Sequence, residues 1–94
     1  MKRTIRQQII ECLEDTEMGA RDISGTLGIR EKEVYDHLSH IRQSLKPMGK
    51  RFVVRPSECI GCGYIFKDRR RLTAPGRCPR CRKTYISDPG FKID

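Results

Sequence analysis

The chain has 94 residues, of which 36% are hydrophobic and 34% charged, so it can bury only one modest core. It starts without an apolar run that could serve as a secretory signal or a membrane span, so we expect a cytoplasmic protein with no membrane partner. The formal net charge of +8 is concentrated in residues 51–94, and such a surplus on a small domain favours a polyanionic partner, most often nucleic acid.

Three helices are predicted in the first half of the chain. Apolar residues at three- and four-residue steps predict a helix over residues 4–15, which Thr4 can cap. A second helix is expected over residues 20–27 and ends at Gly28. The third is expected over residues 31–45, before a proline that prevents its continuation. Its inward positions are Val34, Leu38, Ile41 and Leu45.

The second and third predicted helices, joined by a tight glycine turn, resemble a helix-turn-helix unit. The matching stretch starts at Ala20, passes through Leu27-Gly28-Ile29 and continues with Val34-Tyr35, and it is similar to winged members among bacterial and archaeal repressors. Any three-helix core needs comparable spacing, so a purely structural role for this pattern stays open.

Two short strands are predicted at the two ends of the second half. Residues 51–55, Arg-Phe-Val-Val-Arg, form a strand-like run that Pro56 terminates. Residues 91–94 alternate apolar and polar side chains after the turn signal Asp88-Pro89-Gly90. If the two strands pair, they form the hairpin of a wing, and the segment between them is an insert.

Four cysteines in that insert have the spacing of a metal site. Cys59 and Cys62 form one C-x2-C pair, Cys78 and Cys81 form another, and fifteen residues separate the pairs, as in zinc ribbons. Two such knuckles supply the four thiolates of a structural Zn²⁺ ion, although four-sulfur sites also accept iron. Disulfides would need an oxidising compartment. With all four positions filled and no glycine-rich phosphate loop, we do not expect an enzyme.

The predicted fold class is therefore α+β, a winged helix-turn-helix with a zinc ribbon inserted in the wing. Residues 1–56 and 88–94 would form the winged helix-turn-helix, and residues 57–87 the ribbon. Through these motifs the chain resembles a family of small archaeal predicted transcriptional regulators, in which a helix-turn-helix is fused to a rubredoxin-like zinc ribbon. The resemblance implies this architecture more than a mechanism.

Nucleic-acid contacts are predicted on two surfaces. In winged proteins the third helix enters the major groove, but its exposed N-terminal end here carries more acids than bases. The ribbon is expected to add charge through a basic run at a free loop tip between the knuckles, and phosphate neutralisation supplies most non-specific binding. A solvated charged loop is the plainer alternative. The predicted contacts are Arg30, Lys32, His37, Lys67, Arg69, Arg70, Arg71, Arg82 and Lys83.

Aromatic residues flank the knuckles and allow two roles. Tyr64, Phe66 and Tyr85 can stack on bases, but a ribbon has almost no other core, so we expect them to pack over the metal site.

Three functions compete. The first is a regulator that binds double-stranded DNA, possible as a homodimer because repressors of this kind commonly recognise two half-sites. The second is an adaptor that docks on RNA polymerase or on other transcription proteins. The third is a redox or metal sensor that uses the four thiolates.

Overall fold

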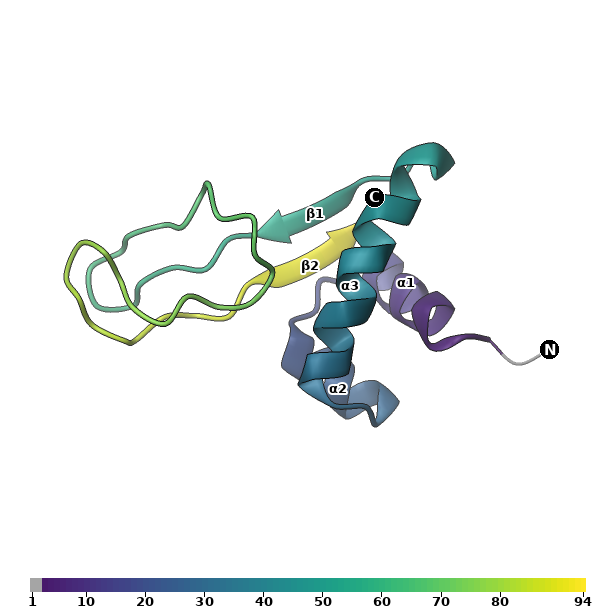
Figure 1. The fold of residues 1–94 in the computed structure, drawn as a ribbon, viewed down its shortest axis with the longest axis horizontal. Coiled ribbons are helices and arrows are strands. Elements are labelled where there is room, and N and C mark those ends of the chain that lie inside the picture. The colour runs from purple at the N-terminus through teal and green to yellow at the C-terminus, as the bar shows by residue number, and fades with distance from the viewer. Residues whose placement is uncertain (1–2) are drawn as a thin grey trace.

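The computed structural model describes residues 3–94 as a helical body joined by a short sheet to a projecting loop region (Figure 1). Its elements, in chain order, are α1 (Ile5–Asp15), α2 (Ala20–Leu27), α3 (Glu31–Leu45), the short 3-10 helix η1 (Lys46–Met48), β1 (Phe52–Arg55) and β2 (Gly90–Ile93). The molecule is elongated, 49 × 28 × 20 Å, because the segment between the strands extends away from the helices.

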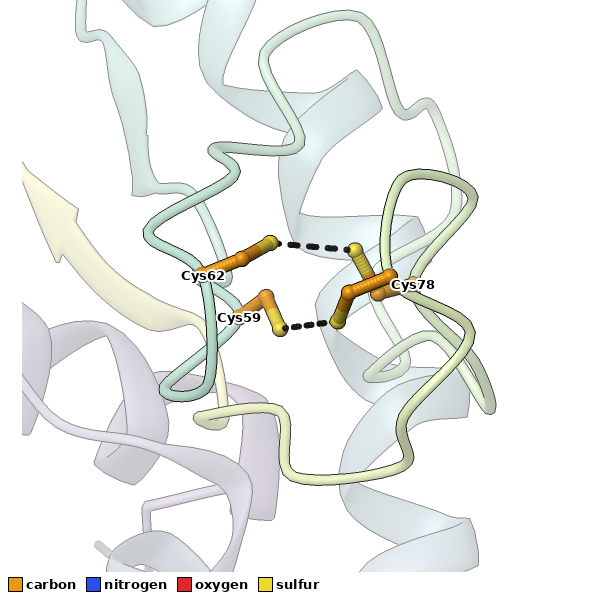
Figure 2. A group of neighbouring side chains, drawn as sticks. Cys59, Cys62 and Cys78 are labelled. Carbon is orange, nitrogen blue, oxygen red and sulfur yellow. Dashed lines mark hydrogen bonds between the residues drawn. The ribbon is translucent and has the colours of Figure 1, made fainter.

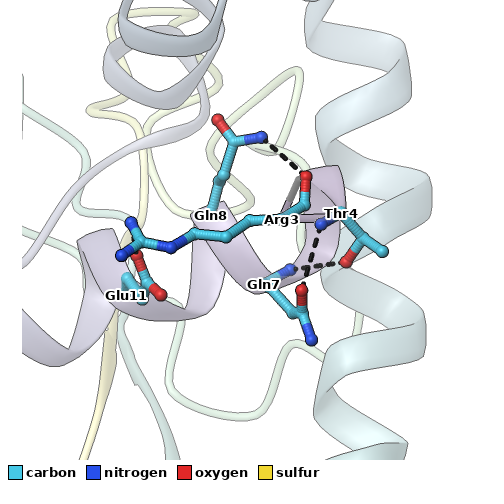
Figure 3. Close-up of polar contacts among 5 residues, drawn as sticks. All are labelled: Arg3, Thr4, Gln7, Gln8 and Glu11. Atoms are coloured by element: carbon cyan, nitrogen blue, oxygen red, sulfur yellow. Dashed lines mark hydrogen bonds and ion pairs between the residues drawn. The ribbon is translucent and has the colours of Figure 1, made fainter. Parts of the chain in front are cut away.

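The N-terminus of α1 is closed by a capping box, as Figure 3 shows. The backbone N–H of Gln7 donates to the Thr4 hydroxyl at 3.1 Å, and the Gln7 side-chain oxygen accepts from the Thr4 backbone N–H at 3.0 Å. Such reciprocal bonds satisfy two donors that the first turn would leave free. Arg3 adds an ion pair to Glu11 at 2.7 Å. The expected helix and its cap are confirmed.

The turn between α2 and α3 depends on glycine. Gly28 has φ 68°, in the left-handed region, and its N–H donates to the Ser24 carbonyl at 2.9 Å. The Ser24 hydroxyl donates to the Ile29 carbonyl across the same turn. Because glycine adopts this conformation without a steric penalty, α2 ends where the sequence predicts.

Helix α3 also has its predicted bounds, Glu31–Leu45. Pro47 does not end the helical conformation at once, because α3 continues into the 3-10 helix η1. That helix ends at its C-cap Gly49, which has φ 70°. A proline tolerates the first turn of a helix, where its missing N–H is not needed.

The strands β1 and β2 pair antiparallel, with Phe52 opposite Ile93 and Val54 opposite Phe91. This pairing confirms the two expected strands, each within one residue of its predicted start. Strand β2 is buried, whereas β1 is largely exposed. Phe91 also forms a two-bond bridge with Met18, at 3.0 and 2.8 Å, which attaches the sheet to the segment between α1 and α2.

One hydrophobic core joins the helices to β2. Its members come from all three helices, from β2 and from one position in the loop region: Ile9, Leu13, Ala20, Ile23, Val34, Leu38, Ile41, Leu45, Leu72, Phe91 and Ile93. The α+β class is confirmed, while the winged helix-turn-helix and the division into residues 1–56 with 88–94 and 57–87 stay predictions.

No helix within residues 3–94 has the length and apolar content needed to cross a membrane. The longest, α3, has 15 residues.

Candidate metal centre and basic surface

The first cysteine pair lies on a tight knuckle that follows β1. The Cys59 N–H donates to the Tyr64 carbonyl and the Gly63 N–H donates to the Cys59 carbonyl, both at 2.8 Å. Gly63 has φ 80°, a conformation that glycine adopts without strain. The turn directs Cys59 and Cys62 toward the same point (Figure 2).

The second pair lies on a matching knuckle with one departure. The Cys78 N–H donates to the Lys83 carbonyl at 3.0 Å, and the Arg82 N–H donates to the Cys78 carbonyl at 2.9 Å. At the position that glycine holds in the first knuckle, this turn has Arg82 with φ 63°. A residue with a side chain is strained in this left-handed region, so the second knuckle stores a small amount of conformational energy.

The four sulfur atoms converge, and all lie within 4.8 Å of one another. The sulfur of Cys59 lies 3.5 Å from that of Cys81, and the sulfur of Cys62 lies 3.6 Å from that of Cys78. Dashed lines mark the two approaches in Figure 2. A disulfide would need about 2.05 Å, and the cysteines are free thiols. Four sulfurs at about 2.3 Å from one Zn²⁺ ion would be roughly 3.8 Å apart in a tetrahedron. The residues therefore fit one tetrahedral metal ion.

The thiols affect one another's protonation. Burial acts to raise the pKa of Cys78, but the backbone N–H groups of Cys81 and Arg80 and the thiols of Cys62 and Cys59 together outweigh it and lower this pKa to about 7. For Cys62 the Tyr64 backbone N–H acts to lower the pKa, but burial and the neighbouring thiols raise it to about 12. One thiolate is thus stabilised by donors around it, and a second beside it is disfavoured. A bound cation would allow all four to ionise.

Backbone bonds between the strand-like edges hold the two knuckles together. The Ile60 N–H donates to the Tyr85 carbonyl at 2.8 Å, and the Ser87 N–H donates to the Glu58 carbonyl at 2.9 Å. Tyr64 and Phe66 are half-buried and pack edge to face with ring centroids 5.0 Å apart.

The expectation that Tyr85 packs over the metal site is wrong, because its side chain is 68% exposed. Its backbone carbonyl, not its ring, contributes to the knuckle contact.

The basic run from Lys67 to Arg71 does not occupy a free loop tip, so this expectation is wrong. The loop folds back on the helical body, where Leu72 is 7% exposed and belongs to the helical core. The guanidinium of Arg42, on α3, donates to the Arg70 carbonyl at 3.1 Å. In Figure 1 the knuckles form the far end of the projection, and the loop between them returns toward α3.

The predicted contact residues of the ribbon fall into two groups. Lys67, Arg69, Arg70 and Arg71 are exposed on the returning loop, and of these Arg70 and Arg71 lie beside α3. Arg69 donates to the Thr73 carbonyl at 2.9 Å and to its hydroxyl at 3.3 Å. Arg82 and Lys83 are exposed on the second knuckle, beside the metal site. The structure therefore does not bring all six together, and their role in nucleic-acid binding stays a prediction.

At the start of α3, Arg30 and Lys32 are exposed as expected, whereas His37 is half-buried. Its Nδ1 atom is enclosed and has no hydrogen-bond partner within residues 3–94, so His37 is less exposed than its place at the predicted contact end of the helix implied. Glu31, which lies between Arg30 and Lys32, forms an ion pair with Arg21 at 3.3 Å.

Arg42 and Leu72 were not among the residues predicted to form a functional surface. Arg42 lies in the last turns of α3, beyond the N-terminal end on which the helix-turn-helix comparison concentrates. Leu72 is a single apolar residue directly after three arginines. This position could have indicated a buried contact from the sequence, because a single large apolar side chain in a charged loop favours burial against the rest of the protein.

The fold and the four-cysteine geometry define a small α+β protein with a rubredoxin-like zinc ribbon. One family model, described as "PF0610-like, N-terminal", matches residues 4–53, and a second, described as "PF0610 rubredoxin-like zinc beta-ribbon domain", matches residues 56–94. Since the first covers more than half of the chain, this protein belongs to the PF0610-like family. No curated protein matches the sequence.

Among solved structures, the chain is similar to the solution NMR structure of protein PF0610 from Pyrococcus furiosus. The TM-score is 0.81 at 26% sequence identity, over 100% of this chain and 94% of the other. The likeness therefore extends over the helical body and the ribbon together.

Proposed function

We propose that this protein is a DNA-binding transcriptional regulator, in which a winged helix-turn-helix is combined with a ribbon that holds one structural zinc ion. The observation that carries the proposal is the return of the basic loop to α3. Leu72 enters the helical core and Arg42 binds the Arg70 carbonyl. Arg70 and Arg71 are thereby held beside the helix that would enter the major groove.

The arrangement of the elements supports this role. α2, the Gly28 turn and α3 have the order of a helix-turn-helix unit, and β1 with β2 correspond to its wing. The start of α3 is rich in acidic residues and lacks the positive charge that phosphate contacts need. The neighbouring basic loop supplies that positive charge. Division of labour between a helix that contacts bases and basic residues that contact phosphate is common in DNA recognition.

Zinc suits the ribbon because four thiolates in tetrahedral positions satisfy a Zn²⁺ ion completely. The ion would be held by Cys59, Cys62, Cys78 and Cys81. It supplies structural cross-linking rather than catalysis, since no coordination position is left for a substrate. Metal analysis of the purified protein tests this assignment, and a red protein with visible absorption would indicate iron and favour the redox alternative.

Selection of bound fragments from a randomised duplex library tests the main function. We expect enrichment of a defined sequence, and a palindrome would also indicate a homodimer, because two half-sites mirror two-fold symmetry. Absence of any enrichment would contradict a sequence-specific regulator.

A second experiment tests the part that the loop plays. Replacing Arg69, Arg70 and Arg71 together by glutamine should weaken duplex binding and lower the slope of log K against log salt by up to about 0.9 per lost phosphate contact. The control replaces three exposed cations of the helical body, Arg6, Lys46 and Arg51, by glutamine. An equal change in both triple variants would mean that only net charge matters.

An adaptor on the transcription machinery is the second candidate, favoured by apolar exposure at the far end of the ribbon. Ile60 is 73% exposed and Tyr85 is 68% exposed, and the two are neighbours across a backbone hydrogen bond. Apolar side chains at a projecting end suit protein contacts. Capture of RNA polymerase subunits from nuclease-treated extract, lost in an Ile60→Ser/Tyr85→Ser variant, would support docking. Retention of polymerase only with intact DNA would support the regulator.

A further inference from the structure

A groove of about 360 Å³ separates α3 from the returning loop. We call it the α3-loop groove and define it by its lining: Tyr35, Ser39, Arg42, Arg70, Arg71, Leu72 and Thr73. Three of these residues lie on one flank of α3, at steps of four and three positions. The others come from a segment about thirty residues later, so only the tertiary fold assembles the groove.

The lining is rich in positive charge and contains no carboxylate. Within residues 3–94, the arginines that form ion pairs are Arg3, Arg21 and Arg55, and none of them belongs to the groove. The three groove arginines therefore retain their charge without an acidic partner in this part of the chain. A surface with this excess of positive charge attracts anions.

The groove is held in place by its neighbours. Leu72 anchors the loop in the core, and the Arg42 guanidinium braces it through the Arg70 carbonyl. Arg69 binds Thr73 from outside the groove and closes the loop on itself. Because these contacts fix the backbone, only the exposed arginine side chains, and not the loop itself, have to be ordered when an anion arrives.

Hydroxyl groups complete the donor set. Ser39 and Tyr35 belong to the lining, and the Thr73 hydroxyl, which accepts from Arg69, keeps its own proton free to donate. Burial, followed by the negative charge of Asp88 and Glu31, raises the pKa of Tyr35. Tyr35 thus stays protonated at neutral pH, but the two carboxylates that act on it disfavour an anion beside its ring, so Ser39 and Thr73 are the hydroxyl donors for an anion at the arginine end of the groove.

We propose that the α3-loop groove binds a phosphate group, with the guanidinium groups of Arg42, Arg70 and Arg71 as its principal donors. Arginine forks match the geometry of phosphate oxygens, and hydroxyls add neutral hydrogen bonds. The bound group is a phosphodiester of the duplex backbone beside the major groove that α3 would enter, and this identification rests on the proposed function. A free phosphate monoester has the same recognition chemistry.

The test uses the metal-loaded full chain and follows the arginine side-chain N–H signals by NMR during titration with inorganic phosphate and, separately, with a duplex selected as above. We expect both probes to shift the signals of Arg42, Arg70 and Arg71 while that of Arg6 stays in place. In Arg71→Gln the phosphate affinity should fall at least five-fold, whereas Arg6→Gln should leave it unchanged. Uniform shifts across exposed arginines, or an unchanged affinity in Arg71→Gln, would overturn the proposal.

Arg71→Gln is the main variant because no hydrogen bond or ion pair of the Arg71 side chain is found within residues 3–94, so its loss leaves the fold intact. Arg42→Lys provides a second variant, which keeps the charge but loses the fork, and should weaken phosphate binding several-fold. The outcomes separate the two proposals. Phosphate binding in the groove without duplex binding would sustain the groove and defeat the regulator. Duplex binding whose salt slope is unaltered in Arg71→Gln would defeat the groove and sustain the regulator.

Discussion

The helical body and the ribbon are stabilised by different means. The body buries side chains from three helices and from β2 around Phe91, which is fully buried. Between residues 57 and 87 the buried apolar residues are Cys59, Cys78 and Leu72, and the last of these belongs to the core of the body. Two cysteine thiols are therefore the ribbon's own core. Hydrophobic packing therefore holds the helical body, whereas the ribbon relies on four cysteines that could bind one metal ion.

Metal removal is expected to separate the two regions most strongly. Apparent binding free energies of structural zinc are about 10–16 kcal/mol, which a ribbon without an apolar core cannot replace. A chelator should abolish the dispersed NMR signals of residues 57–66 and 77–87 and leave most helical circular dichroism in place. Cys59→Ser should behave like the chelated protein, and Cys12→Ser, outside the metal site, should not. Simultaneous loss of helix signal would show that both regions unfold as one unit.

Leu72→Ala is expected to have the next largest effect, because this ribbon residue is buried in the core of the body. Truncation of a buried leucine costs about 2–5 kcal/mol, and the lower part of this range applies near the edge of a core. Denaturant unfolding followed by helical circular dichroism should show the loss. Ile60→Ala, at a side chain that is 73% exposed, is the matched control and should change stability by less than about 0.5 kcal/mol. Equal stability of the two variants would mean that the loop does not support the body.

Gly25, inside α2, and Gly28, which caps the C-terminus of α2, should respond in opposite directions to the same substitution. Gly28→Ala places a side chain at φ 68° and should cost about 1 kcal/mol. Gly25→Ala lies inside the helix, where an added Cβ meets no atom within 4 Å, and should stabilise the protein by about 0.5–1 kcal/mol. Thermal unfolding of both variants provides the measurement. Stabilisation by both would show that the α2–α3 turn does not require glycine.

Arg82→Gly is expected to have the smallest effect and compares the two knuckles. Glycine removes the left-handed strain of about 1–2 kcal/mol but loses more backbone entropy on folding, so a net stabilisation of about 0.5–1 kcal/mol remains. Competition with a chromophoric chelator should show tighter metal binding, by up to about five-fold. Gly63→Ala should weaken it, since Gly63 has φ 80°. Weaker binding by Arg82→Gly would indicate that the arginine charge balances the thiolates.

Local features of the sequence determined the helices, the strands and the metal ligands. Apolar spacing, a capping threonine and the glycine after α2 act within a few residues of their own position, so their consequences can be predicted without the rest of the chain. The two C-x2-C pairs likewise require only that two turns meet, because one ion accepts four thiolates in a single geometry.

The tertiary structure alone decided where the basic loop lies. Residues 67–76 have no periodicity, so their direction depends on one contact, Leu72 with the helical core, and on the brace from Arg42. The enclosed Nδ1 of His37 and the exposed ring of Tyr85 depend in the same way on distant neighbours. Sequence patterns specify which residues can be buried, but packing between remote segments determines which of them are, and thereby forms the α3-loop groove.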